Sequence, residues 1–146
     1  MKYFFDTSAF VKFFRDEIGT EKISEIILDK SNDIWIMELA KLEFYSALYR
    51  QFRNKELNEN ELNIIFKELD EDLENIRIEP FTNEIIIEAE KLLKIYGKDY
   101  GLRTLDALHL SSCYLISDED IIFVSSDDIL CKVAEKLDIK TINPVN

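Results

Sequence analysis

Four acidic residues occupy positions where carboxylates could carry out chemistry. Asp6 and Asp127 each follow a short apolar run, whereas Glu43 and Asp106 lie within strongly apolar stretches. A carboxylate in apolar surroundings is costly unless it is paired or bound to a metal ion. Four carboxylates brought together would repel one another, and Mg2+ or Mn2+, which prefer oxygen ligands, would relieve that repulsion. These four acids are therefore candidate metal ligands and catalytic residues of a site that activates water at a phosphodiester.

The two acids that follow apolar runs also have a purely structural interpretation. Asp6 and Asp127 precede expected helices, where an aspartate commonly caps the helix or interacts favourably with its dipole. Asp128 directly follows Asp127, so either aspartate could be the fourth ligand. A metal site requires that the acids converge in the fold, which the sequence by itself does not establish.

The other two acids have alternatives within their own helices. Glu43 lies in the most apolar helical stretch, where it could pair with Arg50 or line a groove that is open to water. Asp106 would lie in the first turn of a helix that Thr104 could cap, where the helix dipole favours an acid. The surrounding leucines make a fully solvated aspartate less expected at that position.

The elements that must position these acids alternate between short strands and longer helices. Such alternation indicates an α/β domain in three layers, with a parallel sheet of about five strands flanked by helices. Ligands of these sheets bind beyond the carboxyl ends of the strands, where the strand order reverses. Asp6 and Asp127 would thus face one crevice if their strands were neighbours. The expected strands are 3–5, 34–36, 76–78, 121–124 and 141–142, and the expected helices are about 7–14, 20–30, 38–54, 58–74, 83–96, 103–116 and 127–137, with Gly97 and Gly101 in a loop.

Length and composition limit the classes of protein that fit. The 146 residues suit a single domain over 1–146, and a net charge of -12 argues against a passive nucleic-acid-binding module, since most such modules are basic. The single histidine, His109, and the two cysteines, Cys113 and Cys131, cannot form a typical zinc site by themselves. No apolar run approaches the roughly 18 residues needed to span a bilayer, so we expect a cytoplasmic protein that does not enter the membrane.

Short motifs around the four acids resemble the PIN-domain family, and within it the VapC-like toxins of toxin–antitoxin pairs. The resemblance covers nearly the whole chain, and the match around Asp106 is the most specific part. Any one motif is a weak signal, but five in the right order are a strong one. The motifs are Asp6-Thr7-Ser8-Ala9, Leu42-Glu43 followed by Ala47-Leu48, Leu105-Asp106-Ala107-Leu108-His109-Leu110, Phe123-Val124-Ser125-Ser126-Asp127 and Asn143-Pro144.

This resemblance implies both a fold and a function. It implies a sheet whose first and fourth strands are adjacent at the centre, and an endoribonuclease that uses Mg2+ or Mn2+ bound by Asp6, Glu43, Asp106 and Asp127. It further implies a homodimer that a cognate antitoxin protein holds inactive. Ser8 or Ser125 would hydrogen-bond a ligand carboxylate.

Several other residues receive simpler interpretations. Residues 55 to 90 hold twelve acids against three basic residues, which we interpret as a solvated helix face, although it could receive a basic partner. His109 lies one turn after Asp106 and could orient water, but we interpret it as a histidine packed between helices. Candidate phosphate contacts that are more commonly surface charges are Lys12, Arg15, Arg50, Arg53 and Arg103, and the aromatic residues expected in the core are Tyr45, Tyr49 and Phe52.

Three rival functions remain to be weighed. A PIN-like scaffold that binds a partner without catalysis would not need the four acids. A phosphotransfer enzyme of the haloacid dehalogenase type would use Asp6 as its nucleophile, but Ser8 stands where such enzymes usually have a second aspartate. A Ser-His-Asp hydrolase would have to use His109, and the chain has no nucleophile elbow.

Overall fold

The structure is a computed structural model that describes residues 1–118 and 120–146. Its centre is a five-stranded parallel sheet in the order β3-β2-β1-β4-β5, which confirms the predicted α/β class. Each predicted strand is present, with each bound within one residue of expectation. The strands are β1 (Lys2–Phe5), β2 (Asp33–Met37), β3 (Arg77–Glu79), β4 (Ile121–Val124) and β5 (Lys140–Ile142).

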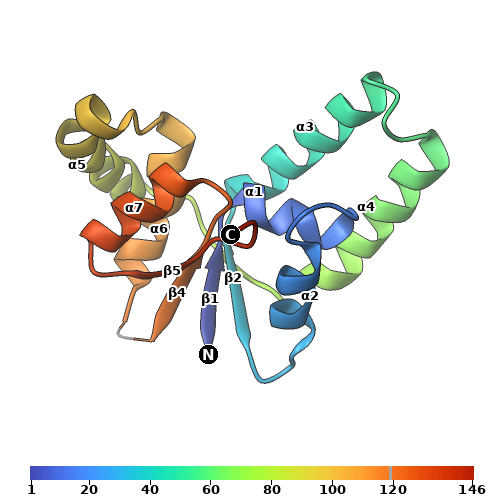
Figure 1. Cartoon of the computed structure of the whole chain (residues 1–146), viewed down its shortest axis with the longest axis horizontal. Helices are drawn as coiled ribbons and strands as arrows, with labels where there is room; N and C mark the ends of the chain where they lie inside the picture. Colours follow the sequence, from blue (N-terminus) through green and yellow to red (C-terminus); the bar gives the residue numbers. More distant parts are fainter. Residues whose placement is uncertain (119) are drawn as a thin grey trace.

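Helices cover both faces of this sheet. Figure 1 shows α5, α6 and α7 on one face and α1 to α4 on the other, with α3 and α4 forming a hairpin that projects from the sheet. Among the described helices, none combines the length and apolar character that a membrane crossing requires. The helices are α1 (Thr7–Phe10), the 3-10 helix η1 (Val11–Phe14), α2 (Thr20–Leu28), α3 (Leu39–Arg53), α4 (Glu59–Leu73), α5 (Asn83–Tyr100), α6 (Thr104–Ile116) and α7 (Asp128–Lys136).

The alternation of side chains along the strands divides the core in two. Tyr3 and Phe5 of β1 pack toward the α1–α4 layer, whereas Phe4 between them packs toward α5, α6 and α7. Phe123 of β4 stacks on Phe4 with ring centroids 6.3 Å apart. Because successive side chains of a strand point to opposite faces, strands buried on both faces must be apolar throughout. The run Ile121–Val124 shows this, since all four residues are buried.

The central position of β1 puts Asp6 and Asp127, two acids of the predicted site, at the ends of neighbouring strands. Its partners are β2 on one side and β4 on the other, with Phe5 opposite Val124. The backbone N–H of Asp6 donates to the carbonyl oxygen of Val124 at 3.1 Å. The chain runs outward from β1 through β2 to β3 and then returns to add β4 and β5 on the other side. The strand order therefore reverses between β1 and β4, where a ligand crevice is expected in such sheets.

Two expectations about helices are wrong in detail. The predicted helix 7–14 divides into α1 and η1, a short α-helix followed by a 3-10 helix. Gly97 was expected in a loop, but it lies inside α5, where the helix continues to Tyr100. Gly101 does end that helix, with a left-handed φ of 65° that glycine adopts without strain.

The acidic helix α4 folds as its pattern predicts. The side chain of Asn58 accepts from the N–H of Glu61, and the Glu61 side chain accepts from the N–H of Asn58, which forms a capping box. The helix buries Leu62, Ile65 and Leu69 against the core. Its acidic side chains therefore cover the outer face of the projecting hairpin, as the interpretation of a solvated face requires.

Candidate active site

Asp6 is a buried carboxylate at the end of β1. It caps α1 by accepting the N–H of Ala9 on Oδ1 at 3.0 Å, and Ser8 donates to the same oxygen at 2.7 Å. Ser125, at the end of β4, donates to Oδ2 at 2.6 Å. The predicted serine contacts are thus both present. Burial raises the pKa of Asp6 above its ordinary value, and these three donors oppose that rise by stabilising the ionised form.

Asp127 caps α7 at the end of β4. Its Oδ1 accepts the N–H groups of Ile129 at 2.9 Å and Leu130 at 3.2 Å. The capping interpretation is therefore correct for both Asp6 and Asp127, and it does not prevent either carboxylate from facing the crevice. Ser125 connects them, because its Oγ also accepts the N–H of Asp127 at 3.1 Å.

Asp128 differs from its neighbour in the direction of its side chain. Its Oδ1 accepts from the side-chain amides of Asn143 at 2.7 Å and Asn146 at 2.9 Å. The carboxylate of Asp128 is therefore hydrogen-bonded to the C-terminal segment, whereas the charge of Asp127 acts on Asp106. This geometry favours Asp127 over Asp128 as the fourth acid of the site.

Asp106 lies in the first turn of α6 and is half-buried. Burial raises its pKa, the negative charges of Asp127 and Asp6 raise it further, and Arg103 and His109 oppose the rise. The Arg103 guanidinium lies 3.7 Å from Oδ2 and is itself largely exposed. Thr104 was expected to cap α6, but Arg103 occupies the cap position without a side-chain cap bond. Asp106 thus interacts electrostatically with both Asp127 and Asp6.

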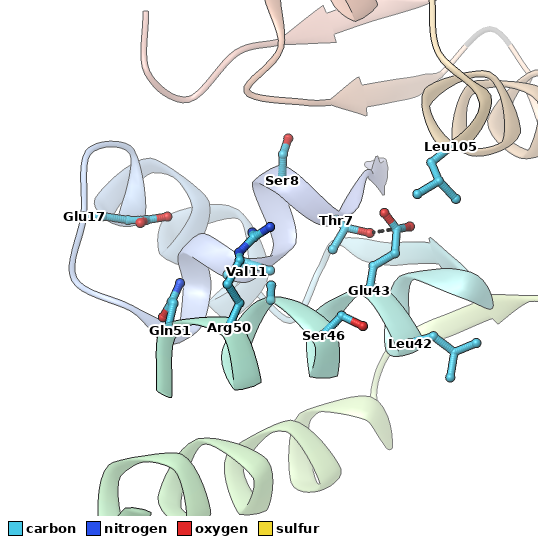
Figure 2. A pocket seen from close by; sticks show the side chains of 11 residues that line it. Thr7, Ser8, Val11, Glu17, Leu42, Glu43, Ser46, Arg50, Gln51 and Leu105 are labelled. Atoms are coloured by element: carbon cyan, nitrogen blue, oxygen red, sulfur yellow. Dashed lines mark hydrogen bonds between the residues drawn. The ribbon is translucent and has the colours of Figure 1, made fainter. Parts of the chain in front are cut away.

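Glu43 reaches the site from α3. Figure 2 shows its carboxylate directed toward Thr7, which donates to Oε1 at 3.1 Å. His109 of α6 hydrogen-bonds the same oxygen through Nε2. Within residues 1–118 and 120–146, no ion pair joins Glu43 to Arg50, the alternative that the sequence left open. Glu43 is thus connected to the residue after Asp6 and to the helix that carries Asp106.

A cavity of about 520 Å3 opens beside Glu43. Figure 2 shows Ser8 and Val11 on one side, and Ser46 and Arg50 of α3 on the other. The three aspartates do not line this cavity, whereas Glu43 does. The full lining is Thr7, Ser8, Val11, Glu17, Leu42, Glu43, Ser46, Ala47, Arg50, Gln51 and Leu105.

The side chains do not form a closed metal cage as they stand. Across the described residues, no three His, Cys, Asp or Glu side chains lie close enough together to hold an ion. The donor set nevertheless fits Mg2+ or Mn2+, because it consists of carboxylate oxygens. Burial is the largest cause of the raised pKa of Asp106, and the negative charges of Asp127 and Asp6 add to it.

A family model now gives the relation of this chain to known proteins. The model described as PIN domain matches residues 3–136, which is most of the sequence. The chain belongs to the PIN domain family. The predicted family is thereby confirmed, and the match includes Asp6, Glu43, Asp106 and Asp127. No curated protein matches this PIN-domain chain.

Solved structures share the fold over nearly the whole PIN-domain chain. FitAcB from Neisseria gonorrhoeae is similar with a TM-score of 0.72, 16% identity and coverage of 97% of each chain. VapBC2 from Rickettsia felis, bound to a DNA fragment from its promoter, is similar with a TM-score of 0.66 and 18% identity. The match covers 97% of this chain and 98% of that one. A toxin–antitoxin complex from Klebsiella pneumoniae is similar with a TM-score of 0.57 and 14% identity, and the match covers 86% of each chain. At these identities the similarity establishes the fold.

The residues around the site include several that sequence reasoning interpreted differently. His109 is buried between helices as expected, but its hydrogen bond to Glu43 was not anticipated. The only available signal was its spacing, one helical turn after Asp106. Tyr45 packs on Phe66 in the core as predicted, whereas Tyr49 and Phe52 are exposed, at 46% and 39%. Among the candidate phosphate contacts, Lys12 pairs with Glu17, Arg103 with Asp106, and Arg50 lines the cavity.

Proposed function

We propose that this PIN-domain protein is a metal-dependent endoribonuclease, the toxin of a cytoplasmic toxin–antitoxin pair, which hydrolyses RNA phosphodiester bonds. The proposed metal ligands and catalytic residues are Asp6, Glu43, Asp106 and Asp127. Family membership supports a nuclease, and the carboxylates at the ends of β1 and β4 supply its chemistry. Asp6 and Asp127 also cap helices, a role that serine or asparagine can fill equally well, so capping alone does not require acids at these positions.

The observation that carries this proposal is the position of Asp6 and Asp127 beyond the carboxyl ends of the adjacent strands β1 and β4, where the strand order reverses. Burial raises the pKa of Asp106 in the first turn of α6, and the negative charges of Asp127 and Asp6 raise it further. A protein gains nothing in stability from such repulsion, whereas a bound Mg2+ or Mn2+ would relieve it. When bound, the ion would activate water and stabilise negative charge at the phosphodiester.

The remaining residues of the site orient these carboxylates and accommodate the substrate. Ser8 and Ser125 fix both oxygens of Asp6, while Thr7 and His109 fix Oε1 of Glu43. Arg50 places a positive charge in the cavity next to Glu43, where it would contact RNA phosphates. The overall charge of -12 makes that contact and the metal ion the main sources of attraction for RNA.

An antitoxin partner is part of the proposal. The similar structures include a VapBC2 assembly and a toxin–antitoxin complex, and this chain shares their fold. The acidic outer face of α4 offers a surface for a basic partner, since charge complementarity guides specific association. We also propose that the chain forms a homodimer in solution.

The decisive experiment is cleavage of total cellular RNA by the purified, partner-free chain. We expect cuts at discrete sites with Mg2+ or Mn2+, no cuts with EDTA, and a loss of roughly 100-fold or more in Asp106→Asn and Asp127→Asn, as for other electrostatic catalytic groups. Asp128→Asn is the matched control, because that carboxylate is bonded to Asn143 and Asn146. It should cleave like the wild type.

Two results would reject the proposal. Cleavage that persists in EDTA or in Asp106→Asn would assign the activity to a contaminant or to another site. A folded, partner-free chain that binds no Mn2+ and cleaves no RNA would instead favour a PIN-domain scaffold that binds a partner without catalysis.

A further inference from the structure

His109 occupies an unusual place for the only histidine of the chain. It lies on α6, one turn after Asp106, and its side chain is almost completely buried, with 3% exposed. Its Nε2 faces two groups from other parts of the fold, Oε1 of Glu43 on α3 and Oγ1 of Thr7 on α1, the latter at 3.3 Å. The imidazole therefore lies where three helices of the site meet.

The chemistry of the three groups determines which atom donates each hydrogen bond. An ionised carboxylate only accepts, so Nε2 must carry a proton to bond Glu43. Thr7 also donates to Oε1 of Glu43, and its oxygen can accept from the same Nε2–H. Two donors thus converge on one oxygen of Glu43, which leaves the other oxygen, Oε2, for a further interaction.

We propose that His109 is a positioning residue, which holds the carboxylate of Glu43 in the orientation that the metal site requires. This inference rests on the proposed function, since it assigns a role within that same site. The helix α6 would then supply one proposed ligand itself, Asp106, and would fix a second, Glu43, through His109. The two helices that carry these acids belong to opposite layers of the fold, so a contact between them sets their spacing.

Simple packing does not account for this arrangement equally well. A buried side chain that only filled space would be best apolar, as its neighbours Leu108 and Leu110 are. Within the described part of the chain, Nδ1 of His109 has no hydrogen-bond partner, so the ring carries a cost that its contact with Glu43 must offset. Hydrogen bonds to metal-binding side chains commonly tune affinity and activity in this way.

The first test compares two substitutions of different chemistry with a control on the same helix. Gln at position 109 can still donate to Glu43, whereas Leu cannot. We expect His109→Leu to weaken Mn2+ binding, measured by calorimetry, and RNA cleavage by about 10–100-fold, with His109→Gln recovering most of both. The control Ser112→Ala changes another fully buried polar residue of α6 and should leave both unchanged. Equal Mn2+ affinity in His109→Leu and the wild type would overturn the proposal, as would Gln and Leu variants that are equally impaired.

The second test does not depend on cleavage. Because the chain has one histidine, 15N-histidine labelling of the untagged, metal-free protein gives a single imidazole. We expect its Nε2 resonance to report a protonated, hydrogen-bonded nitrogen that shifts in Glu43→Ala but not in Glu90→Ala, which removes an exposed acid of α5. An Nε2 signal unchanged in Glu43→Ala would overturn the proposal.

These measurements separate the failure of the positioning role from that of the proposed function. A wild-type chain that binds Mn2+ without cleaving RNA would reject the ribonuclease, while the Mn2+ affinities of the two His109 variants would still decide the positioning role. A wild-type chain that binds no Mn2+ would overturn both.

Discussion

The two central strands β1 and β4 end in the same way but in different surroundings. Each is followed by an aspartate that caps the next helix, Asp6 for α1 and Asp127 for α7. Asp6 is 4% exposed and both of its oxygens accept hydrogen bonds, from two serine hydroxyls and one backbone N–H. Asp127 is half-buried, and the hydrogen bonds described for it all go to Oδ1.

This difference separates a fixed carboxylate from an adjustable one. Asp6 is held from three sides, so its position is set before any ligand arrives. The cap bonds of Asp127 leave Oδ2 without a described partner, so this carboxylate can reorient at lower cost. Preorganised groups lower the free-energy cost of reaching the productive geometry. The site would then combine one rigid acid at β1 with a responsive one at β4.

The largest stability effect we predict is at the residue that joins the two strand ends. Ser125→Ala removes the donor to Asp6 and the acceptor for the N–H of Asp127. We expect a loss of about 2 kcal/mol in the free energy of unfolding, as for hydrogen bonds to charged groups. Chemical denaturation measures it. Ser126→Ala is the control, because Ser126 Oγ has no described partner. A loss of equal size in the control would mean that the two strand ends are not joined through Ser125.

A smaller loss is expected at the end of β4 alone. Asp127→Ala removes the cap of α7 and should cost about 1 kcal/mol, the usual value for a helix N-cap. Relief of repulsion with Asp106 would reduce that loss further. Asp128→Ala serves for comparison, since Asp128 is exposed and the hydrogen bonds described for its side chain go to Asn143 and Asn146 of the C-terminal segment. If Asp127→Ala destabilised the protein more than Ser125→Ala, the β4 end would be the more rigid of the two.

Much of this architecture could be predicted from the sequence because the strands are short and uniformly apolar. The run Ile121–Val124 was predicted with its observed bounds, and the adjacency of β1 and β4 followed from the family resemblance. Gly97 was misassigned because glycine only weakens a helix interior, and α5 continues past it to Tyr100, which packs on Tyr96 and against the core.

The site was less predictable, because local patterns do not specify side-chain direction. Asp127 and Asp128 are adjacent acids, and only the tertiary position of Asn143 distinguishes them. His109 looked like a packing residue because its surroundings are apolar, and its partner Glu43 lies 66 positions away along the chain. Tyr49 was expected in the core, yet the projecting hairpin of α3 and α4 leaves it exposed.

The smallest effect we predict is at Asp106, whose pKa responds to the acids at both strand ends. Burial and the charges of Asp127 and Asp6 raise its pKa above the ordinary value of 3.8, so the folded protein holds a proton more tightly than the unfolded chain. The wild type therefore loses stability as the pH rises from the unfolded pKa through the higher folded one, and the full cost is present above both. Asp106→Asn carries no such charge.

Without metal, we expect this variant to melt slightly above the wild type at neutral pH, and the difference should vanish as the pH falls below the unfolded pKa. Adding Mg2+ should reverse the order, because the ion would stabilise the wild type through a ligand that the variant lacks. Thermal denaturation with EDTA and with Mg2+ at several pH values measures both effects. A metal-free variant less stable than the wild type at neutral pH would show that Asp106 is held by favourable contacts. Repulsion from the ends of β1 and β4 would then no longer support the proposed metal ion at this site.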